Sequence, residues 1–141
     1  MHNKAIFNWQ IRVYYEDTDA GGVVYHAQYL KFMERARTEW LRQMGFEHTA
    51  LLHLYQCVFV VHSLQIQYKK SAKLSDWLNI ACTLTKVGYS SIEFLQTISS
   101  AEQILVNAQV KLACVDALSF KPVNTPQAVK QLMQKQMMEW V

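Results

Sequence analysis

One stretch organises the whole chain, residues 14–26, which read Tyr14-Tyr15-Glu16-Asp17-Thr18-Asp19-Ala20-Gly21-Gly22-Val23-Val24-Tyr25-His26. It combines acidic side chains, a Gly-Gly pair and a histidine, and a long amphipathic segment follows it directly. The two glycines permit backbone conformations that other residues avoid, or let a ligand approach the main chain closely. The stretch is therefore typical of a site in which a carboxylate faces the N-terminus of a helix.

The residues before this stretch alternate between apolar and polar, which predicts a half-buried strand over residues 6–15. Its apolar side carries Phe7, Trp9, Ile11, Val13 and Tyr15. We therefore expect Tyr15, and not Tyr14, to enter the loop of residues 17–26 on the core side.

Residues 27–44 have the 3.6-residue period of a helix, and Gly45 is a plausible stop. The apolar stripe contains Tyr29, Phe32, Met33, Ala36, Trp40 and Met44, with Leu30 and Leu41 at its edge. Arg37 falls inside this stripe. Because Glu34 precedes it by three residues, we expect the two side chains to form an ion pair.

The remainder predicts a loop or short helix over residues 46–56, then four strands over 58–69, 77–87, 91–99 and 104–114. The tail from Thr125, with Pro126 near its start, predicts a short C-terminal helix. We expect one α+β domain over residues 1–141, in which a curved five-stranded antiparallel sheet, its last four strands in a meander, wraps around one long helix. Apolar residues on the second side of several strands predict an oligomer interface; these are Phe59, Val61, Leu105 and Val115.

Composition excludes several classes of protein. The chain has 141 residues, 51% of them hydrophobic and 18% charged, which is ordinary for a soluble globular domain. The net charge of +3 comes without a cationic run longer than Lys69-Lys70, so nucleic-acid binding is not expected. A weak positive bias does suit a small anionic ligand.

The three cysteines form no CxxC motif, so neither a zinc site nor a redox pair is expected. The N-terminus lacks the apolar core of a signal peptide, which makes a reduced cytoplasmic compartment the default. The longest apolar run, residues 57–61, is too short to span a bilayer.

Asp17 and Asp19 are the candidate acids. A carboxylate can act as general base or nucleophile if it lies beside an electrophile. On spacing alone, Asp-x-Asp-x-Gly-Gly is explained as well by turn chemistry, and it lacks the further ligands of a calcium loop. Their spacing leaves open which of the two acids takes part in chemistry.

His26 precedes the predicted helix, where backbone N–H groups lack partners and the dipole is positive. Such an N–H group can stabilise an oxyanion whatever the His26 side chain does. His48, His53 and His62 are interpreted as structural or surface residues. No histidine pair has the spacing of metal ligands, and no serine lies in a Gly-x-Ser-x-Gly context.

The chain resembles a known family over most of its length. The resemblance rests on residues 12–30, on Glu34-Arg35-Ala36-Arg37-Thr38-Glu39, on residues 60–70 and on residues 114–122. These segments are similar to hot-dog-fold acyl-CoA thioesterases of the 4-hydroxybenzoyl-CoA thioesterase group, and within it to the Tol–Pal-associated (YbgC-type) branch.

This resemblance implies specific roles. Asp19 matches the catalytic carboxylate, as nucleophile or as general base, which leaves Asp17 to shape the loop. His26 matches the residue whose backbone N–H holds the thioester carbonyl, and the Tyr15 hydroxyl lies near the site. The implied substrate contacts are Gly22, Val23, Lys70 and Lys121, with the lysines on the phosphates of CoA. Lys70-Ser71-Ala72 departs from relatives, many of which carry a proline there.

The implied activity is hydrolysis of acyl-CoA without metal or cofactor, on short-chain acyl groups first and longer ones second. Homodimers or homotetramers with sites at the dimer interface are implied, as is a cytoplasmic location, with the inner face of the inner membrane as an associated site. Two other functions stay open: a hot-dog hydratase or dehydratase, and a scaffold that binds acyl carrier protein or envelope partners with little turnover.

Overall fold

The computed structural model describes residues 5–137 of the chain. In chain order, its elements are β1 (Ile6–Arg12), the 3₁₀ turn η1 (Tyr15–Asp17), α1 (Gln28–Gln43), α2 (His48–Tyr55), β2 (Cys57–Tyr68), β3 (Trp77–Val87), β4 (Ser91–Ser100), β5 (Gln103–Asp116) and α3 (Gln127–Met137). The predicted domain boundaries, residues 1 and 141, lie outside the described residues.

The five strands form one antiparallel sheet in the order β1-β3-β4-β5-β2. The prediction of a meander through the last four strands is therefore wrong for β2. This strand pairs with β5 along its whole length, from Cys57 opposite Asp116 to Tyr68 opposite Val106. The segment 69–76 carries the chain from β2 to β3, and β2 is left at the free edge of the sheet.

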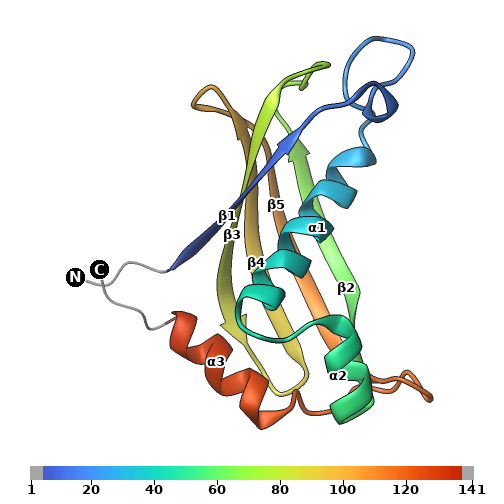
Figure 1. Cartoon of the computed structure of the whole chain (residues 1–141), viewed down its shortest axis with the longest axis vertical. Coiled ribbons are helices and arrows are strands. Elements are labelled where there is room, and N and C mark those ends of the chain that lie inside the picture. The colour runs from blue at the N-terminus through green and yellow to red at the C-terminus, as the bar shows by residue number, and fades with distance from the viewer. Residues whose placement is uncertain (1–4, 138–141) are drawn as a thin grey trace.

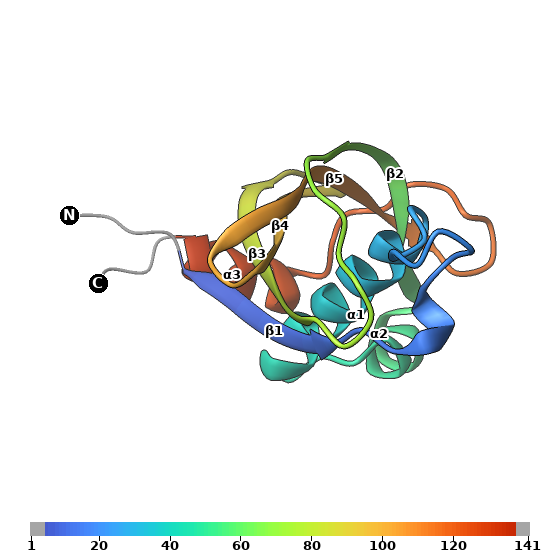
Figure 2. The same ribbon diagram turned by 90° about the horizontal axis from the view of Figure 1, so that it is seen from above.

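The sheet curls around α1, as seen from above in Figure 2. The α1 stripe lies in the core as predicted: Tyr29, Phe32, Met33, Ala36 and Trp40 are buried together with Leu41. Met44 is only half-buried, and Gly45 ends the helix at φ +93°. The prediction of an α+β hot-dog arrangement, with a curved sheet around one long helix, is confirmed.

Two smaller helices lie beside this core. α3 packs against β3, while α2 packs against the beginning of β2 (Figure 1). Val129 and Met133 are the buried residues of α3, and Leu51 is the buried residue of α2. The loop over residues 13–27 lies at the opposite end of the sheet from α2 (Figure 1).

The first strand is shorter than predicted. β1 ends at Arg12, and Tyr15 begins the 3₁₀ turn, so the alternation of β1 does not extend to Tyr15. The Tyr15 side chain is 82% exposed instead of turned toward the core. The change of backbone conformation after Val13, which is buried, explains why the strand period fails here.

The predicted second apolar side is only partly present. Leu105 and Val115 are buried, each 4% exposed, whereas Val61 is 48% exposed. The register of β2 also shifts between Val61 and Ser63, which makes His62 the additional residue of a bulge. On β2 the exposed apolar side chains are Val60, Val61, Leu64 and Tyr68, so this edge strand carries more of them than any other strand of the sheet within residues 5–137.

Arg37 does not pair with Glu34 in the described residues, so the expected ion pair is wrong. Its Nη1 donates to Gln96 Oε1 over 2.9 Å. The Gln96 side chain is fully buried, and its Nε2 donates to the Met33 carbonyl (3.1 Å) and to Cys82 Sγ (2.9 Å). A neutral amide from β4 thus accommodates the cation inside the apolar stripe.

Candidate active site

Asp17 shapes the loop over residues 13–27, as predicted. Its carboxylate is buried and accepts two hydrogen bonds of 2.8 Å, from the Tyr14 backbone N–H and from Gln28 Nε2. Its main-chain carbonyl accepts the Tyr25 N–H over 2.9 Å. One residue thereby connects the entry of the loop to the first turn of α1.

Asp19 lies at the exposed turn of the same loop. The Asp19 N–H donates to the Val23 carbonyl (2.9 Å), and the Gly22 N–H donates to the Asp19 carbonyl (3.0 Å). Oδ1 accepts the Gly21 N–H over 2.8 Å. Oδ2 has no hydrogen-bond partner within residues 5–137, so one carboxylate oxygen is available to a substrate or to water.

The geometry of the loop explains why glycine occupies positions 21 and 22. A Cβ on Gly21 would lie 3.2 Å from Asp19 Oδ1, and Gly22 has a φ of +80° that favours glycine. The glycine pair therefore sets the path of the loop beneath the Asp19 carboxylate. A side chain at either position would displace this carboxylate or strain the turn.

α1 begins at Gln28, one residue later than predicted, and His26 lies in the tight turn that precedes it. The Gln28 N–H closes this turn onto the Tyr25 carbonyl over 2.8 Å. The N–H groups of His26 and Ala27 point out of it and make no hydrogen bond to any described residue. Unpaired donors at the positive end of a helix can hold a carbonyl oxygen that gains negative charge.

Tyr68 and Tyr29 also lie at this site, although the sequence analysis did not assign them to it. The Tyr68 hydroxyl donates to the His26 carbonyl over 2.8 Å. Its ring is 5.6 Å from the Tyr29 ring and 6.3 Å from the His26 ring, measured between centroids. Tyr68 occupies the end of β2, so only its pairing with β5 could have revealed its position next to the loop.

The remaining predicted contacts divide into two groups. Val23 forms a bridge with Lys73, and Val24 donates its N–H to the Ala72 carbonyl, so Gly22, Val23 and the segment that carries Lys70 lie on the same side of the molecule. The loop that carries Lys121 does not. Its first residue, Ala117, bonds to Gln56 before β2, roughly 36 Å along that strand from Tyr68.

Sequence and structure comparisons identify the family. The family model of the Thioesterase superfamily matches residues 21–107. An acyl-CoA thioesterase YbgC from Haemophilus influenzae is 49% identical over 88% of this chain and 91% of its own. The chain belongs to the thioesterase superfamily.

Two further matches agree with this assignment. The thioesterase is 46% identical to an acyl-CoA thioester hydrolase YbgC from Escherichia coli, over 90% of this chain and 95% of the relative. The crystal structure of a probable thioesterase from Bartonella henselae, 36% identical, superposes with a TM-score of 0.83 and covers 86% of this chain and all of the other. The fold and the loop over residues 13–27 therefore belong to a thioester hydrolase.

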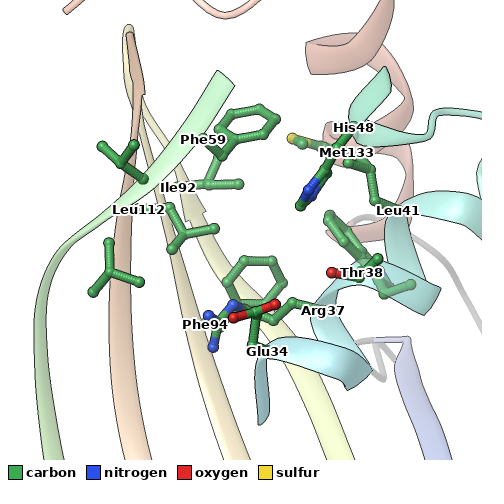
Figure 3. A pocket seen from close by; sticks show the side chains of 13 residues that line it. Glu34, Arg37, Thr38, Leu41, His48, Phe59, Ile92, Phe94, Leu112 and Met133 are labelled. Carbon is green, nitrogen blue, oxygen red and sulfur yellow. The ribbon is translucent and has the colours of Figure 1, made fainter. Parts of the chain in front are cut away.

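A cavity of about 400 Å³ lies between the second half of α1, the start of α2 and the sheet (Figure 3). Its walls include Arg37, Thr38, His48, Phe59 and Phe94. A smaller hollow of about 220 Å³ shares Glu34, Arg37 and Val61 with it and continues to Leu30, near the beginning of α1. Together the two hollows form one groove along α1, which we name the α1–β2 groove.

The cysteines of the thioesterase are unsuited to nucleophilic attack, as predicted. All three are free and buried. Burial raises the pKa of Cys82 to about 11 and that of Cys114 to about 12, so neither forms the thiolate that attack requires near neutral pH. Within residues 5–137 no three His, Cys, Asp or Glu side chains gather as metal ligands, and no helix is long and apolar enough to cross a membrane.

Proposed function

We propose that this thioesterase hydrolyses acyl-CoA, with Asp19 as the catalytic carboxylate and the His26 backbone N–H as the oxyanion donor. The observation that supports this proposal most directly is the pairing of residues 17–19 with residues 23–25. It brings an exposed carboxylate to the same loop end as a turn in which the N–H groups of His26 and Ala27 bond to no residue within 5–137. The activity named for the 46–49% identical relatives agrees with it.

In this proposal the thioester carbonyl accepts the His26 N–H, which stabilises the negative charge that develops on its oxygen. Asp19 Oδ2 then either removes a proton from a water that attacks the carbonyl carbon, or attacks this carbon itself to form an acyl-enzyme anhydride that water hydrolyses in a second step. CoA leaves as the thiol, and the acyl group leaves as the free acid. The His26 side chain and the Tyr15 hydroxyl are proposed to line the reacting thioester, and no cofactor is required.

The decisive experiment replaces Asp19 by Asn, which keeps the shape and the hydrogen bond from Gly21. We expect kcat for thiol release to fall at least about 100-fold, because the amide is neither nucleophile nor base at neutral pH. Glu16→Gln is the matched control, since Glu16 is exposed on the same loop. Near-normal turnover by folded Asp19→Asn protein would refute the catalytic assignment.

We propose that two copies pair through β2, whose exposed Val60, Val61 and Leu64 are otherwise left at a free sheet edge. A two-fold pairing that keeps both helices on one face runs the two strands antiparallel. It brings the Lys121 loop of one copy to the Asp19 loop of the other. Lys121 and Lys70 are then proposed to hold the CoA phosphates from two chains, and pairs of dimers to form tetramers.

The α1–β2 groove is proposed to receive the acyl chain. It begins at Leu30, within one turn of the helix start, and is lined largely by apolar side chains. The length of this groove supports longer acyl groups as substrates, which the resemblance implies only after short ones. Acyl carrier protein is proposed as an alternative acyl donor, which a thiol-release assay with matched acyl-CoA and acyl carrier protein substrates tests directly.

We propose a reducing compartment, the cytoplasm, because all three cysteines are free and buried. A contact with the inner membrane is proposed through the loop after β5. There Leu118 is 88% exposed and Phe120 is 65% exposed, next to Lys121. Sedimentation with anionic vesicles is expected to carry the protein down and to fail for Phe120→Ser; equal sedimentation of both proteins would argue against this contact.

A further inference from the structure

Tyr68 joins the edge strand to the turn before α1. Its hydroxyl lies 2.8 Å from the His26 carbonyl oxygen and, because a carbonyl only accepts, the hydroxyl must be the donor. The backbone of the strand end is itself well held, since the N–H groups of Lys69 and Lys70 both donate to the Leu105 carbonyl, over 2.8 and 3.1 Å. The Tyr68 hydroxyl is therefore positioned by a part of the backbone that hydrogen bonds hold in place.

The Tyr68 ring is also held in place, by the ring of Tyr29. It packs at 5.6 Å against the buried ring of Tyr29, whose hydroxyl accepts the Ala72 N–H over 3.0 Å. The Ala72 carbonyl in turn accepts the Val24 N–H over 2.9 Å. The end of β2 and the segment after it therefore contact the loop over residues 13–27 separately, through the Tyr68 hydroxyl on one side and through Ala72 and Lys73 on the other.

Tyr68 stays protonated, so its hydroxyl can donate the hydrogen bond to the His26 carbonyl at all neutral pH values. Burial raises the pKa of this phenol above its ordinary value near 10. The hydroxyl consequently keeps its proton throughout the neutral range. A phenolate at this place would face a carbonyl oxygen and repel it.

We propose that Tyr68 is a positioning residue for hydrolysis: its hydroxyl holds the His26 carbonyl, fixes the peptide plane between His26 and Ala27, and thereby restrains the turn that presents the unpaired His26 N–H. The proposal rests on the proposed function, because it concerns the donor that the thioester oxygen is meant to meet. The peptide plane that carries the His26 N–H is already held within the turn, because the Tyr25 carbonyl in that plane accepts the Gln28 N–H. The next plane, which carries the His26 carbonyl and the Ala27 N–H, has no such bond within the turn and needs a restraint from outside it. Tyr68 supplies this restraint from β2.

The experiment is Tyr68→Phe, which removes the hydroxyl and keeps the ring packed on Tyr29. Thiol release is measured over a range of acyl-CoA concentrations. We expect kcat to fall about three- to tenfold, the range that one neutral hydrogen bond supplies. KM is expected to stay within twofold, since CoA and the acyl chain keep their contacts.

Tyr25→Phe is the matched control. Its ring also neighbours His26, at 4.6 Å, but its hydroxyl makes no hydrogen bond to any described residue. We expect it to retain full kcat. A second readout is the ¹³C shift of the labelled His26 carbonyl, assigned by its disappearance in His26→Asn: this shift should move upfield in Tyr68→Phe and stay in Tyr25→Phe, because only the former loses the bond.

Three results would overturn the proposal: an unchanged kcat in Tyr68→Phe, a rise in KM alone, or an equal loss in Tyr25→Phe. Asp19→Asn is assayed beside these variants. If it loses activity while Tyr68→Phe does not, the positioning role fails and the proposed function stands. If Asp19→Asn itself keeps its turnover, the proposed function fails.

Discussion

Cys82 on β3 shows how burial in this core affects an ionisable side chain. Its thiol is 2% exposed, accepts the Gln96 Nε2–H and lies in the same network as the guanidinium of Arg37. Burial raises the pKa of Cys82 to about 11, and it lowers the pKa of Arg37. Both shifts follow from the cost of keeping a charge in an apolar interior.

The raised pKa of Cys82 predicts alkaline destabilisation. Between pH 9 and 11 the unfolded chain loses the thiol proton while the native chain retains it, so the free energy of unfolding falls as the pH rises. For this group the fall is about 3 kcal/mol. Urea unfolding at several pH values should show a shallower decline for Cys82→Ala than for the natural protein; identical slopes would contradict the prediction.

Among the elements, α1 carries both halves of the proposed chemistry. The Asp19 loop and the His26 turn lie at its N-terminus, and the α1–β2 groove follows its length. Thr38 lies eleven residues beyond Ala27, which corresponds to about 16 Å of helix. An extended acyl chain zigzags and advances about 1.25 Å per C–C bond, so 12 carbons reach about 14 Å along the groove and roughly 14 carbons cover the whole distance.

Thr38→Phe is therefore predicted to change chain-length preference. The larger side chain narrows the far part of the groove, so kcat/KM for a 12-carbon acyl-CoA should fall at least about tenfold, since each buried CH₂ contributes about 0.8 kcal/mol. Turnover of a four-carbon substrate should stay unchanged. Gln43→Phe, exposed on the same helix, is the control. Equal effects on both chain lengths would show that the acyl chain lies elsewhere.

At the scale of the whole molecule, the free edge of β2 has no pairing strand in a single chain. Unpaired strand edges with apolar side chains invite pairing with a second copy. The same pairing would explain why Lys121, which the resemblance assigns to the substrate, lies roughly 36 Å of strand away from His26 in its own chain.

Val61→Lys is predicted to yield monomers, because a charge on each of two antiparallel edges repels the other and loses the apolar contact. Light scattering after size exclusion measures the mass directly. Leu95→Lys, at an exposed position of the interior strand β4, should remain dimeric. A natural protein that is already monomeric would refute the proposed interface.

Mixed dimers test the sharing of Lys121. Asp19→Asn chains are combined with Lys121→Glu chains, so that each mixed dimer has one intact carboxylate and one intact lysine on different chains. Contribution across the interface predicts one site with the KM of the natural enzyme. An elevated KM in the mixed dimers would place Lys121 and Asp19 in the same chain's site.

Much of the fold could be predicted because its signals are local. The stripe on α1, the stop at Gly45 and the strand runs depend on periods of 3.6 and 2 residues, which neighbouring residues determine. The wrong predictions have two kinds of cause, a partner distant in sequence for Arg37 and a local turn for Tyr15. Gln96 accommodates Arg37 in place of Glu34, and the 3₁₀ turn held by the Asp17 carboxylate interrupts the alternation before Tyr15.

For the site, the sequence alone determined the order of its parts: an acid, a glycine turn and a histidine placed before a helix. The resemblance, and not the spacing, distinguished Asp19 from Asp17, and the catalytic role of Asp19 stays a prediction. Only the tertiary structure decided that β2 lies beside β5 at an open edge, and that its last residue, Tyr68, reaches the His26 carbonyl. The physical reason is that strand pairing joins segments far apart in the chain, and the period of a strand does not specify its partner.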